Sequence, residues 1–260
     1  MTPELSAAID RLAATSHLLV ALDFDGTLAP EVDDPEEARA LPEARDAMLR
    51  LLALPDTTLA LVSGRAMASL EHVSELPAGA LLVGSHGVEE RFDGEVRLAI
   101  DAEEQGVLAR LHEVLESVAS ATEGAWIEVK PAGFALHTRL SAPDAAQDAQ
   151  SRARAEAAAI SDSLTVRAGK NVLEFSVRGT TKGEGVDRLR EYTGATGVLF
   201  GGDDVTDEDG FRALRPGDIG LRSGSGDTVA EFRVDGPLEV AAVLDALASR
   251  RSVLYTTGTR

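Results

Sequence analysis

A short apolar run that ends in two acidic residues is the feature that most constrains the fold of this chain. Leu18 to Leu22 is continuously apolar, as is typical of a strand that is buried on both faces of a parallel sheet. Asp23 and Asp25 follow two positions apart, so their carboxylates leave the end of the strand on the same face. Two negative charges so placed favour a bound cation, and oxygen ligands favour Mg²⁺. The plainer interpretation is a turn, because Asp-Gly commonly ends a strand.

Most of the chain alternates between buried strands and helices, which predicts an α/β fold with a doubly wound parallel sheet. The strands are expected at 18–23, 58–62, 80–83, 198–200 and 219–221, and the helices at 3–14, 42–54, 66–75, 181–192, 207–214 and 240–248. A hairpin is expected at 92–100, with its turn at Asp93-Gly94. The tail, 251–260, has little pattern, and we expect it to be disordered.

The middle of the chain follows a different order. A helix and two strands occur twice in succession, at 102–121, 126–130, 134–139, 144–160, 164–167 and 172–176. This order does not continue the alternating pattern, and a segment of this length is within the size range of a small domain. We therefore expect a core domain of residues 1–101 and 178–260, interrupted by an inserted α/β domain of residues 102–177.

The composition limits the kinds of molecule that this chain is expected to bind. The net charge of −19 argues against nucleic acid and anionic membranes. It still permits a small anionic substrate, because charges are screened over about 8 Å at physiological salt. The chain has no cysteine, which excludes disulfides and thiolate metal sites. It contains no run of 18 apolar residues and does not begin like a signal peptide, so we expect a cytoplasmic protein, acting as a monomer.

Polar clusters follow several of the predicted strands: Ser63-Gly64-Arg65, His86, and the acids Asp203, Asp204 and Asp207. Because open α/β sheets bind ligands at the carboxyl ends of their strands, we expect these groups to meet Asp23 and Asp25 in one crevice. Ser63 either binds an anion with the start of the next helix or simply caps that helix.

The last acidic cluster and Lys182 both stand near predicted helix starts. Thr206 and Asp209 resemble a capping box, which would explain part of the acidic cluster but not the acids directly at the strand end. Lys182 occupies a position where a cation is mildly unfavourable, and this local conflict suggests a function. We expect it to pair with a carboxylate nucleophile and with phosphoryl oxygens.

Taken in order, four segments resemble the motifs of the haloacid dehalogenase superfamily of phosphotransferases: Asp23-x-Asp25-Gly26-Thr27, Ser63, Lys182 and Gly202-Asp203-Asp204. The acid at Asp25 resembles the phosphatase and mutase branches. The resemblance implies a Rossmann-like core with an inserted α/β cap, and Mg²⁺ as the cofactor. It implies that Asp23 is the nucleophile, Asp25 the general acid and base, and that Ser63 and Lys182 hold the phosphoryl oxygens. The implied metal site consists of Asp23, Asp25 through its carbonyl, Asp203, Asp204 and Asp207.

A narrower resemblance is to the trehalose-6-phosphate phosphatase family. It is carried by Ser63–Arg65, Gly84–Glu89, Glu128–Lys130 with Phe134–Arg139, Leu173–Phe175 and Gly202–Glu208. It implies hydrolysis of trehalose 6-phosphate through an aspartyl-phosphate, the last step of trehalose biosynthesis. The implied substrate-binding residues are Thr27, Gly64, Arg65, His86, Glu128, Lys130, His137 and Glu174. The chain differs from the family at Thr138, where an aromatic residue is common, and at Ser176–Gly179, where Arg-Pro is common.

Several alternatives remain open at the level of sequence. Glu128 and Lys130 would also suit an ordinary exposed strand face, His137 a packing role, and His86 a loop cap. A phosphatase for sucrose 6-phosphate or mannosyl-3-phosphoglycerate would share every core residue and differ only in the inserted domain. A sugar phosphomutase, or a regulator that binds Mg²⁺ or a sugar phosphate without catalysis, would also retain parts of the pattern.

Overall fold

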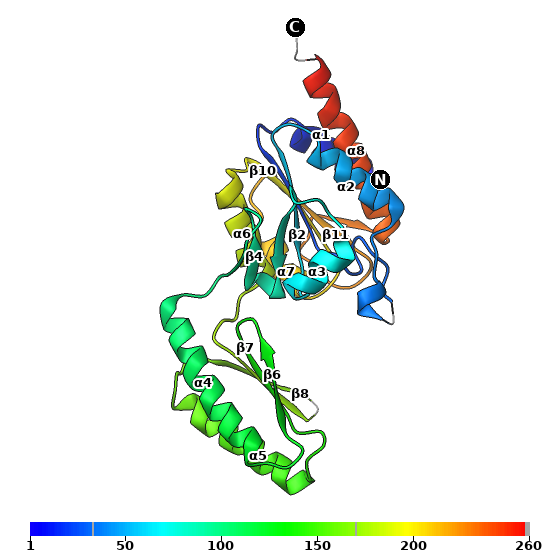
Figure 1. The fold of residues 1–260 in the computed structure, drawn as a ribbon. Helices are drawn as coiled ribbons and strands as arrows, with labels where there is room; N and C mark the ends of the chain where they lie inside the picture. Colours follow the sequence, from blue (N-terminus) through cyan, green and yellow to red (C-terminus); the bar gives the residue numbers. More distant parts are fainter. Residues whose placement is uncertain (33, 170, 258–260) are drawn as a thin grey trace. The chain divides into compact units, whose positions relative to one another are not determined.

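The computed structural model describes residues 1–32, 34–169 and 171–257. The chain divides into two compact units (Figure 1): Met1–Arg97 with Thr180–Arg260, and Leu98–Gly179. The sequence pattern placed this division at 101/102 and 177/178. No helix in the described part of the chain combines the length and the apolarity that a membrane crossing requires.

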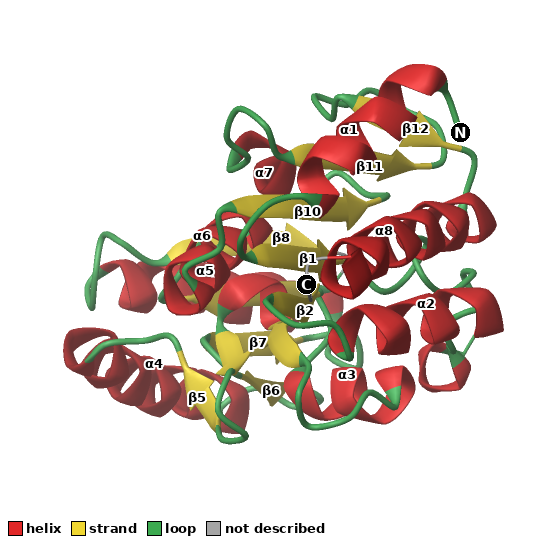
Figure 2. Cartoon of the chain, turned by 90° about the horizontal axis from the view of Figure 1, so that it is seen from above, coloured by secondary structure: helices red, strands yellow, loops and turns green. Residues whose placement is uncertain are grey.

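The described part of the first unit is built on an eight-stranded sheet, in the order β12-β11-β10-β1-β2-β3-β4-β5. Its strands are β1 (Leu18–Leu22), β2 (Thr57–Val62), β3 (Leu81–Gly84), β4 (Glu89–Arg91), β5 (Val96–Leu98), β10 (Gly197–Gly202), β11 (Ile219–Ser223) and β12 (Phe232–Val234). Figure 2 shows β11, β10, β1 and β2 in this order. The strands from β12 to β3 are parallel, and β4 is antiparallel to β3.

Helices cover both faces of this sheet, which explains the continuous apolar runs. One face is covered by α1 (Pro3–Ala13), α2 (Pro42–Leu52), α3 (Met67–Ser74) and α8 (Pro237–Thr257), the other by α6 (Lys182–Thr193) and α7 (Asp207–Arg212). Alternate residues of β1 enter the two cores: Leu18 and Val20 pack with the first set of helices, Leu19 and Ala21 with the second. The expectation of a doubly wound α/β fold is therefore confirmed.

In the second unit, helices cover one face of an antiparallel sheet. Among its described residues, four strands pair in the order β6-β7-β9-β8. The elements are α4 (Ala102–Ser120), β6 (Trp126–Lys130), β7 (Gly133–His137), α5 (Pro143–Ala158), β8 (Thr165–Gly169) and β9 (Val172–Ser176). Figure 1 shows α4 and α5 on the same side of this sheet. Phe134 and Phe175 pack with these helices in a separate hydrophobic core. Because side chains alternate along a strand, residues such as Glu128 and Glu174 lie on the opposite face.

The C-terminal segment differs from the expectation. Instead of ending near residue 248, α8 continues to Thr257, so the expected disorder from 251 onward is wrong for the described part; residues 258–260 lie outside it. The reason is Arg251, which is buried and donates hydrogen bonds to the carbonyl oxygens of Ala13, Thr15 and Asp56. A buried arginine has no apolar signature in the sequence.

Two short strands were also misjudged. The predicted hairpin at 92–100 begins earlier, because Glu89–Arg91 pairs with β3. The three residues of β12 pair with β11, but they are too few to show a pattern in the sequence.

Candidate active site

A buried lysine holds two carboxylates at the carboxyl ends of the central strands. Asp23 follows β1, and Lys182 is the first residue of α6, which Thr181 caps by accepting from the Glu184 N–H. The Lys182 Nζ lies 2.9 Å from Asp23 Oδ1 and 2.8 Å from Asp207 Oδ1. All three side chains are buried, which strengthens these ion pairs relative to exposed ones. The predicted pairing of Lys182 with the Asp23 carboxylate is thus present.

The negative charge of this cluster exceeds what one lysine offsets. Burial raises the pKa of Asp23 to about 8, an effect that Lys182 opposes and Asp207 reinforces. Burial, and then the charge of Asp207, also raise the pKa of Asp203. Although burial alone would lower it, the charges of Asp23 and Asp207 raise the pKa of Lys182 above its ordinary value. The cluster therefore favours either a proton or a further cation.

Three carboxylates fit a divalent cation. Asp23, Asp203 and Asp207 each offer one oxygen, and these oxygens all lie within 4.8 Å of one another. A site made of carboxylate oxygens suits a hard ion such as Mg²⁺. The Asp207 carboxylate is also anchored, because its Oδ2 accepts the N–H groups of Asp203 (3.0 Å) and Asp204 (2.9 Å). The Asp204 carboxylate instead accepts the Val205 N–H at 2.6 Å.

The helix-capping explanation of the acidic cluster is wrong. Thr206 has helical φ and ψ angles of −68° and −21°, and it makes no side-chain hydrogen bond to the first turn of α7. Instead, Asp207 turns back to Lys182 and to the loop that precedes it. Asp207 is held by Lys182 and by the N–H groups of the preceding loop, and Asp203 is held by Thr27, rather than by a cap at the start of the helix.

Ser63 is not a helix cap. It is buried after β2, its Oγ accepts the Arg65 N–H at 3.2 Å, and α3 begins only at Met67. The expectation that Ser63–Arg65 opens this helix is therefore wrong. The backbone of the segment bonds across to the next loop instead: the Ser63 carbonyl accepts from His86, and the Arg65 carbonyl accepts from Ser85.

Arg65 forms a two-pronged ion pair with Asp25. Its Nε lies 2.6 Å from Asp25 Oδ2 and its Nη2 lies 2.7 Å from Asp25 Oδ1. Its third nitrogen donates to Ser69 Oγ at 3.1 Å. The bond to Asp25 raises the pKa of Arg65 further. Predicted as a substrate-binding residue, Arg65 in this structure orients the carboxylate of Asp25.

The remaining predicted core residues shape the surroundings of the acids. Thr27 is buried and donates to Asp203 Oδ1 at 3.2 Å. Gly26 has a φ of +68°, and a Cβ there would lie 2.1 Å from Asp203 Oδ2, so only glycine fits. Gly64 likewise makes room for the His86 ring, which would lie 2.5 Å from an added Cβ. The structure thus brings these residues next to the acids and to Ser63.

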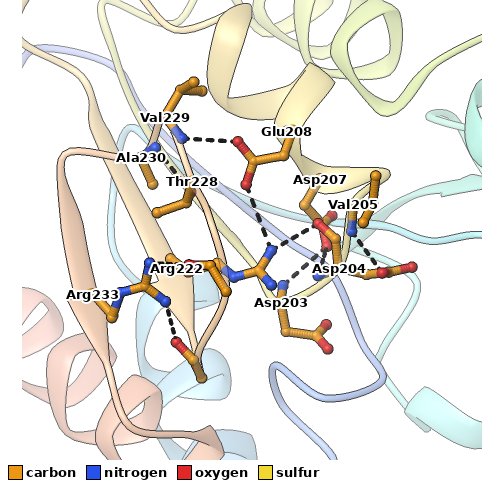
Figure 3. A network of polar contacts seen from close by, with 12 residues as sticks. Asp203, Asp204, Val205, Asp207, Glu208, Arg222, Thr228, Val229, Ala230 and Arg233 are labelled. Carbon is orange, nitrogen blue, oxygen red and sulfur yellow. Dashed lines mark hydrogen bonds and ion pairs between the residues drawn. The ribbon is translucent and has the colours of Figure 1, made fainter.

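Arg222 is a site residue that the sequence analysis missed. It is buried at the end of β11, and its guanidinium lies between Glu208 and the loop that carries Asp203 and Asp204 (Figure 3). Nη1 donates to the Asp204 carbonyl at 2.8 Å and lies 3.6 Å from Glu208 Oε1, and Nη2 donates to the Ser225 carbonyl at 3.0 Å. A basic residue inside a wholly buried strand was the signal that could have revealed it.

The four predicted residues of the second unit form one network on the helix-free face of its sheet. Lys130 Nζ lies 2.8 Å from Glu174 Oε1 and 3.9 Å from Glu128 Oε1. His137 Nε2 lies 2.9 Å from Glu128 Oε2. The structure therefore brings these four together within their own unit.

Comparisons with known proteins identify the family. The trehalose-phosphatase family model matches residues 21–247. The chain belongs to the trehalose-phosphatase family. It is 32% identical to trehalose-6-phosphate phosphatase of Escherichia coli (strain K12), over 95% of this chain and 90% of that protein. It is 31% identical to the bifunctional trehalose-6-phosphate synthase/phosphatase of Thermoproteus tenax, over 92% of this chain, but spans only about a third of that protein's length (34%).

The fold of this trehalose-phosphatase family member agrees with solved structures. The Aspergillus fumigatus trehalose-6-phosphate phosphatase superposes with a TM-score of 0.72 at 26% identity, covering 94% of this chain and 97% of that one. The C-terminal domain of the Candida albicans trehalose-6-phosphate phosphatase gives a TM-score of 0.65 at 25% identity, with 94% and 97% coverage. The predicted family and the haloacid dehalogenase-like fold are confirmed.

Proposed function

We propose that this protein is a Mg²⁺-dependent phosphatase that hydrolyses trehalose 6-phosphate to trehalose and phosphate, the last step of trehalose biosynthesis. The observation that carries the proposal is the cluster of Asp23, Lys182 and Asp207, which are buried, with the partly buried Asp203, in a member of the trehalose-phosphatase family. Such a cluster suits phosphoryl transfer, in which positioning and charge stabilisation dominate catalysis. Every residue invoked below comes from one chain, so the scheme needs no second copy.

In the first step, Asp23 attacks phosphorus and forms an aspartyl-phosphate. The bond between phosphorus and the sugar oxygen breaks, and Asp25 gives its proton to that oxygen. In the second step, Asp25 takes a proton from a water molecule, which attacks the aspartyl-phosphate. Phosphate leaves, and the Asp23 carboxylate and the Asp25 proton are restored.

Asp23 and Asp203 would hold the Mg²⁺ ion together with Asp207 and the Asp25 carbonyl. When bound, the ion offsets the repulsion between the attacking carboxylate and the phosphoryl group. Thr27 supports this arrangement by its hydrogen bond to Asp203. Asp207 keeps its own place through Lys182 and two backbone N–H groups.

Lys182 and Ser63 would bind the phosphoryl oxygens as charge develops on them. Lys182 is already held beside Asp23, and both side chains are buried, where such contacts are stronger than in water. Arg65 keeps Asp25 oriented. Arg65 donates one hydrogen bond to each oxygen of Asp25, so each oxygen keeps a second lone pair through which the carboxyl group can exchange a proton with the sugar.

The second unit would act as a cap that selects the sugar. Its helix-free face carries carboxylates, an ammonium and an imidazole in one network, and these groups can bind sugar hydroxyls. Glu128, Lys130, His137 and Glu174 are the residues that we assign to this selection. In the core we assign the same role to Gly64 and His86: the His86 ring lies against Gly64, and the His86 N–H donates to the Ser63 carbonyl.

The test is phosphate release from trehalose 6-phosphate, sucrose 6-phosphate and glucose 6-phosphate, each with Mg²⁺ and with EDTA. Mg²⁺-dependent release from trehalose 6-phosphate alone is the expected result. Release from another ester alone would keep the mechanism but replace the substrate, and isomerisation without net release would indicate a mutase. The Asp23→Asn variant should release none, and substantial remaining turnover would contradict the nucleophile assignment.

A further inference from the structure

An exposed indole lies beside the polar network of the second unit. Trp126 stands on β6, two residues before Glu128 and therefore on the same, helix-free face of the sheet. Its relative exposure of 37% contrasts with that of Phe134 (8%) and Phe175 (2%), which fill the core on the other face. From its position on the strand, Trp126 cannot reach that core.

The indole of Trp126 stacks on the imidazole of His137. The two residues are direct cross-strand partners, and their rings stack with centroids 4.7 Å apart and planes 6° apart. His137 in turn bonds Glu128 at 2.9 Å, and Glu128 lies 3.9 Å from Lys130. Since His137 covers one face of the indole, a further ring could stack only on the opposite face.

This combination has the chemistry of a carbohydrate site. A sugar ring offers hydroxyl groups, which carboxylates and an ammonium bind, and a flat C–H face, which has no such partners. A rigid aromatic surface buries that face at little conformational cost, and its area contributes to binding. The chain places such a surface directly beside the hydroxyl-binding groups.

We propose that Trp126 is a stacking platform for a sugar ring of the substrate and is thus a specificity-determining residue. The proposal rests on the proposed function, because it assumes a sugar phosphate as the substrate. His137 acts as a positioning residue, which keeps the indole plane and the Glu128 carboxylate in register. Trp126 contributes binding energy to the sugar and takes no part in phosphoryl transfer.

The protein itself supplies the probe, because its sequence contains one tryptophan. We would use the full chain carrying Asp23→Asn, so that trehalose 6-phosphate with Mg²⁺ is bound without turnover. The substrate should change the tryptophan emission in a saturable manner and protect it from acrylamide quenching. Inorganic phosphate, which lacks the sugar, should do neither. Emission and quenching that do not respond to saturating trehalose 6-phosphate would contradict direct contact.

Steady-state kinetics of Trp126 variants provide a second test of the stacking proposal. Trp126→Ala should raise the KM for trehalose 6-phosphate about tenfold with little change in kcat, the signature of lost uniform binding. Trp126→Phe should retain much of the affinity, whereas Trp126→Leu, which is apolar but has no π face, should behave like alanine. Release from p-nitrophenyl phosphate, which has no sugar, should be unchanged in all three. Val129→Ala, at an exposed position on the opposite face of β6, is the matched control.

The two proposals fail separately. If the unchanged protein hydrolyses trehalose 6-phosphate and Trp126→Ala has an unchanged KM, the platform is refuted while the proposed function stands. If the unchanged protein releases phosphate from no sugar ester, the proposed function fails and the platform falls with it. Equal KM values for the phenylalanine and leucine variants would contradict stacking and would mean that Trp126 contributes only apolar packing.

Discussion

Asp23 is the residue at which stability and chemistry oppose each other. Burial raises its pKa to about 8, with Lys182 opposing and Asp207 reinforcing the shift. In the unfolded chain the same carboxyl titrates near its ordinary value of about 3.9. Between these values the folded protein binds more protons than the unfolded one, so raising the pH costs stability. The ionised form that attacks phosphorus is therefore the form that the metal-free fold tolerates least.

This predicts the pH dependence of the metal-free protein. In EDTA, the Tm should fall as the pH rises from about 5.5 to 8.5, because folding must then accommodate an ionised Asp23. Asp203, whose pKa is also raised, adds to the trend in the same direction. Thermal unfolding across this range is the measurement. Asp23→Asn cannot ionise, so its Tm should fall less steeply; equal slopes for the two proteins would refute this account.

The Arg65–Asp25 pair gives a second prediction for single residues. Arg65→Gln should lower kcat for trehalose 6-phosphate by about tenfold to a hundredfold, because the Asp25 carboxyl group remains but loses its orientation. Asp25→Asn, which removes the proton donor, should lose about 10²–10⁴-fold.

A substrate with a better leaving group can distinguish the loss of Asp25 orientation from general damage to the active site. Hydrolysis of p-nitrophenyl phosphate needs little protonation of its leaving group, so both variants should be less impaired with it. Arg39→Gln, which changes a more exposed arginine of the same unit, should match the unchanged protein. An equal loss of kcat on both substrates would mean that Arg65 does not act through Asp25.

Among the helices and strands, the sequence predicted most accurately the strands that are buried on both faces of the sheet. β1, β2, β3, β10 and β11 lie close to their expected positions because helices on both faces demand unbroken apolar runs. The prediction from sequence failed where a contact with a distant part of the chain determines the local structure. Arg251 extends α8 by bonding three carbonyls of another part of the chain, and Ser63 is kept out of α3 by the loop after β3.

The same distinction applies to the candidate site. The acids and Ser63 were found because they follow strands, and parallel strands bring their ends together, whereas Lys182 was found from its position at a helix start. Apart from the pairing of Lys182 with Asp23, which side chains would pair was not predictable, because the partners are far apart in the sequence and on different elements. Arg65 was expected to bind substrate, and its ion pair with Asp25 was not foreseen; Arg222 had no motif to mark it.

Arg222 connects β11 to the loop between β10 and α7, and this gives a prediction for that element. Arg222→Gln cannot replace the bonds to both the Asp204 and Ser225 carbonyls, and it leaves Glu208 without its ion-pair partner. We expect Mg²⁺ affinity, measured by calorimetry, to fall about tenfold or more, as is usual when support of metal ligands is lost. Arg222→Lys should retain part of the affinity, and Arg212→Gln on the surface of α7 should retain it fully. Unchanged Mg²⁺ affinity in a folded Arg222→Gln protein would contradict this role.

At the scale of the whole molecule, the two units have separate interiors. The core of the second unit is made of side chains from α4, α5 and the strands β6, β7 and β9, all within Leu98–Gly179. The large clusters of the first unit are drawn from Met1–Arg97 and Thr180–Arg260. Since a domain folds on the strength of its own core, insertion into another domain need not make the second unit dependent on it.

We therefore predict that the fragment Leu98–Gly179 folds alone. It should give the circular dichroism of a mixed helix and sheet protein and unfold in a cooperative thermal transition. Phe175→Ala in the same fragment should abolish that transition, because losing a buried phenylalanine costs about 3–5 kcal/mol, a large part of the stability of a small domain. Val129→Ala, at an exposed position, should leave the transition in place. A fragment that shows no cooperative transition, while the complete chain does, would mean that the inserted unit needs the surrounding domain to fold.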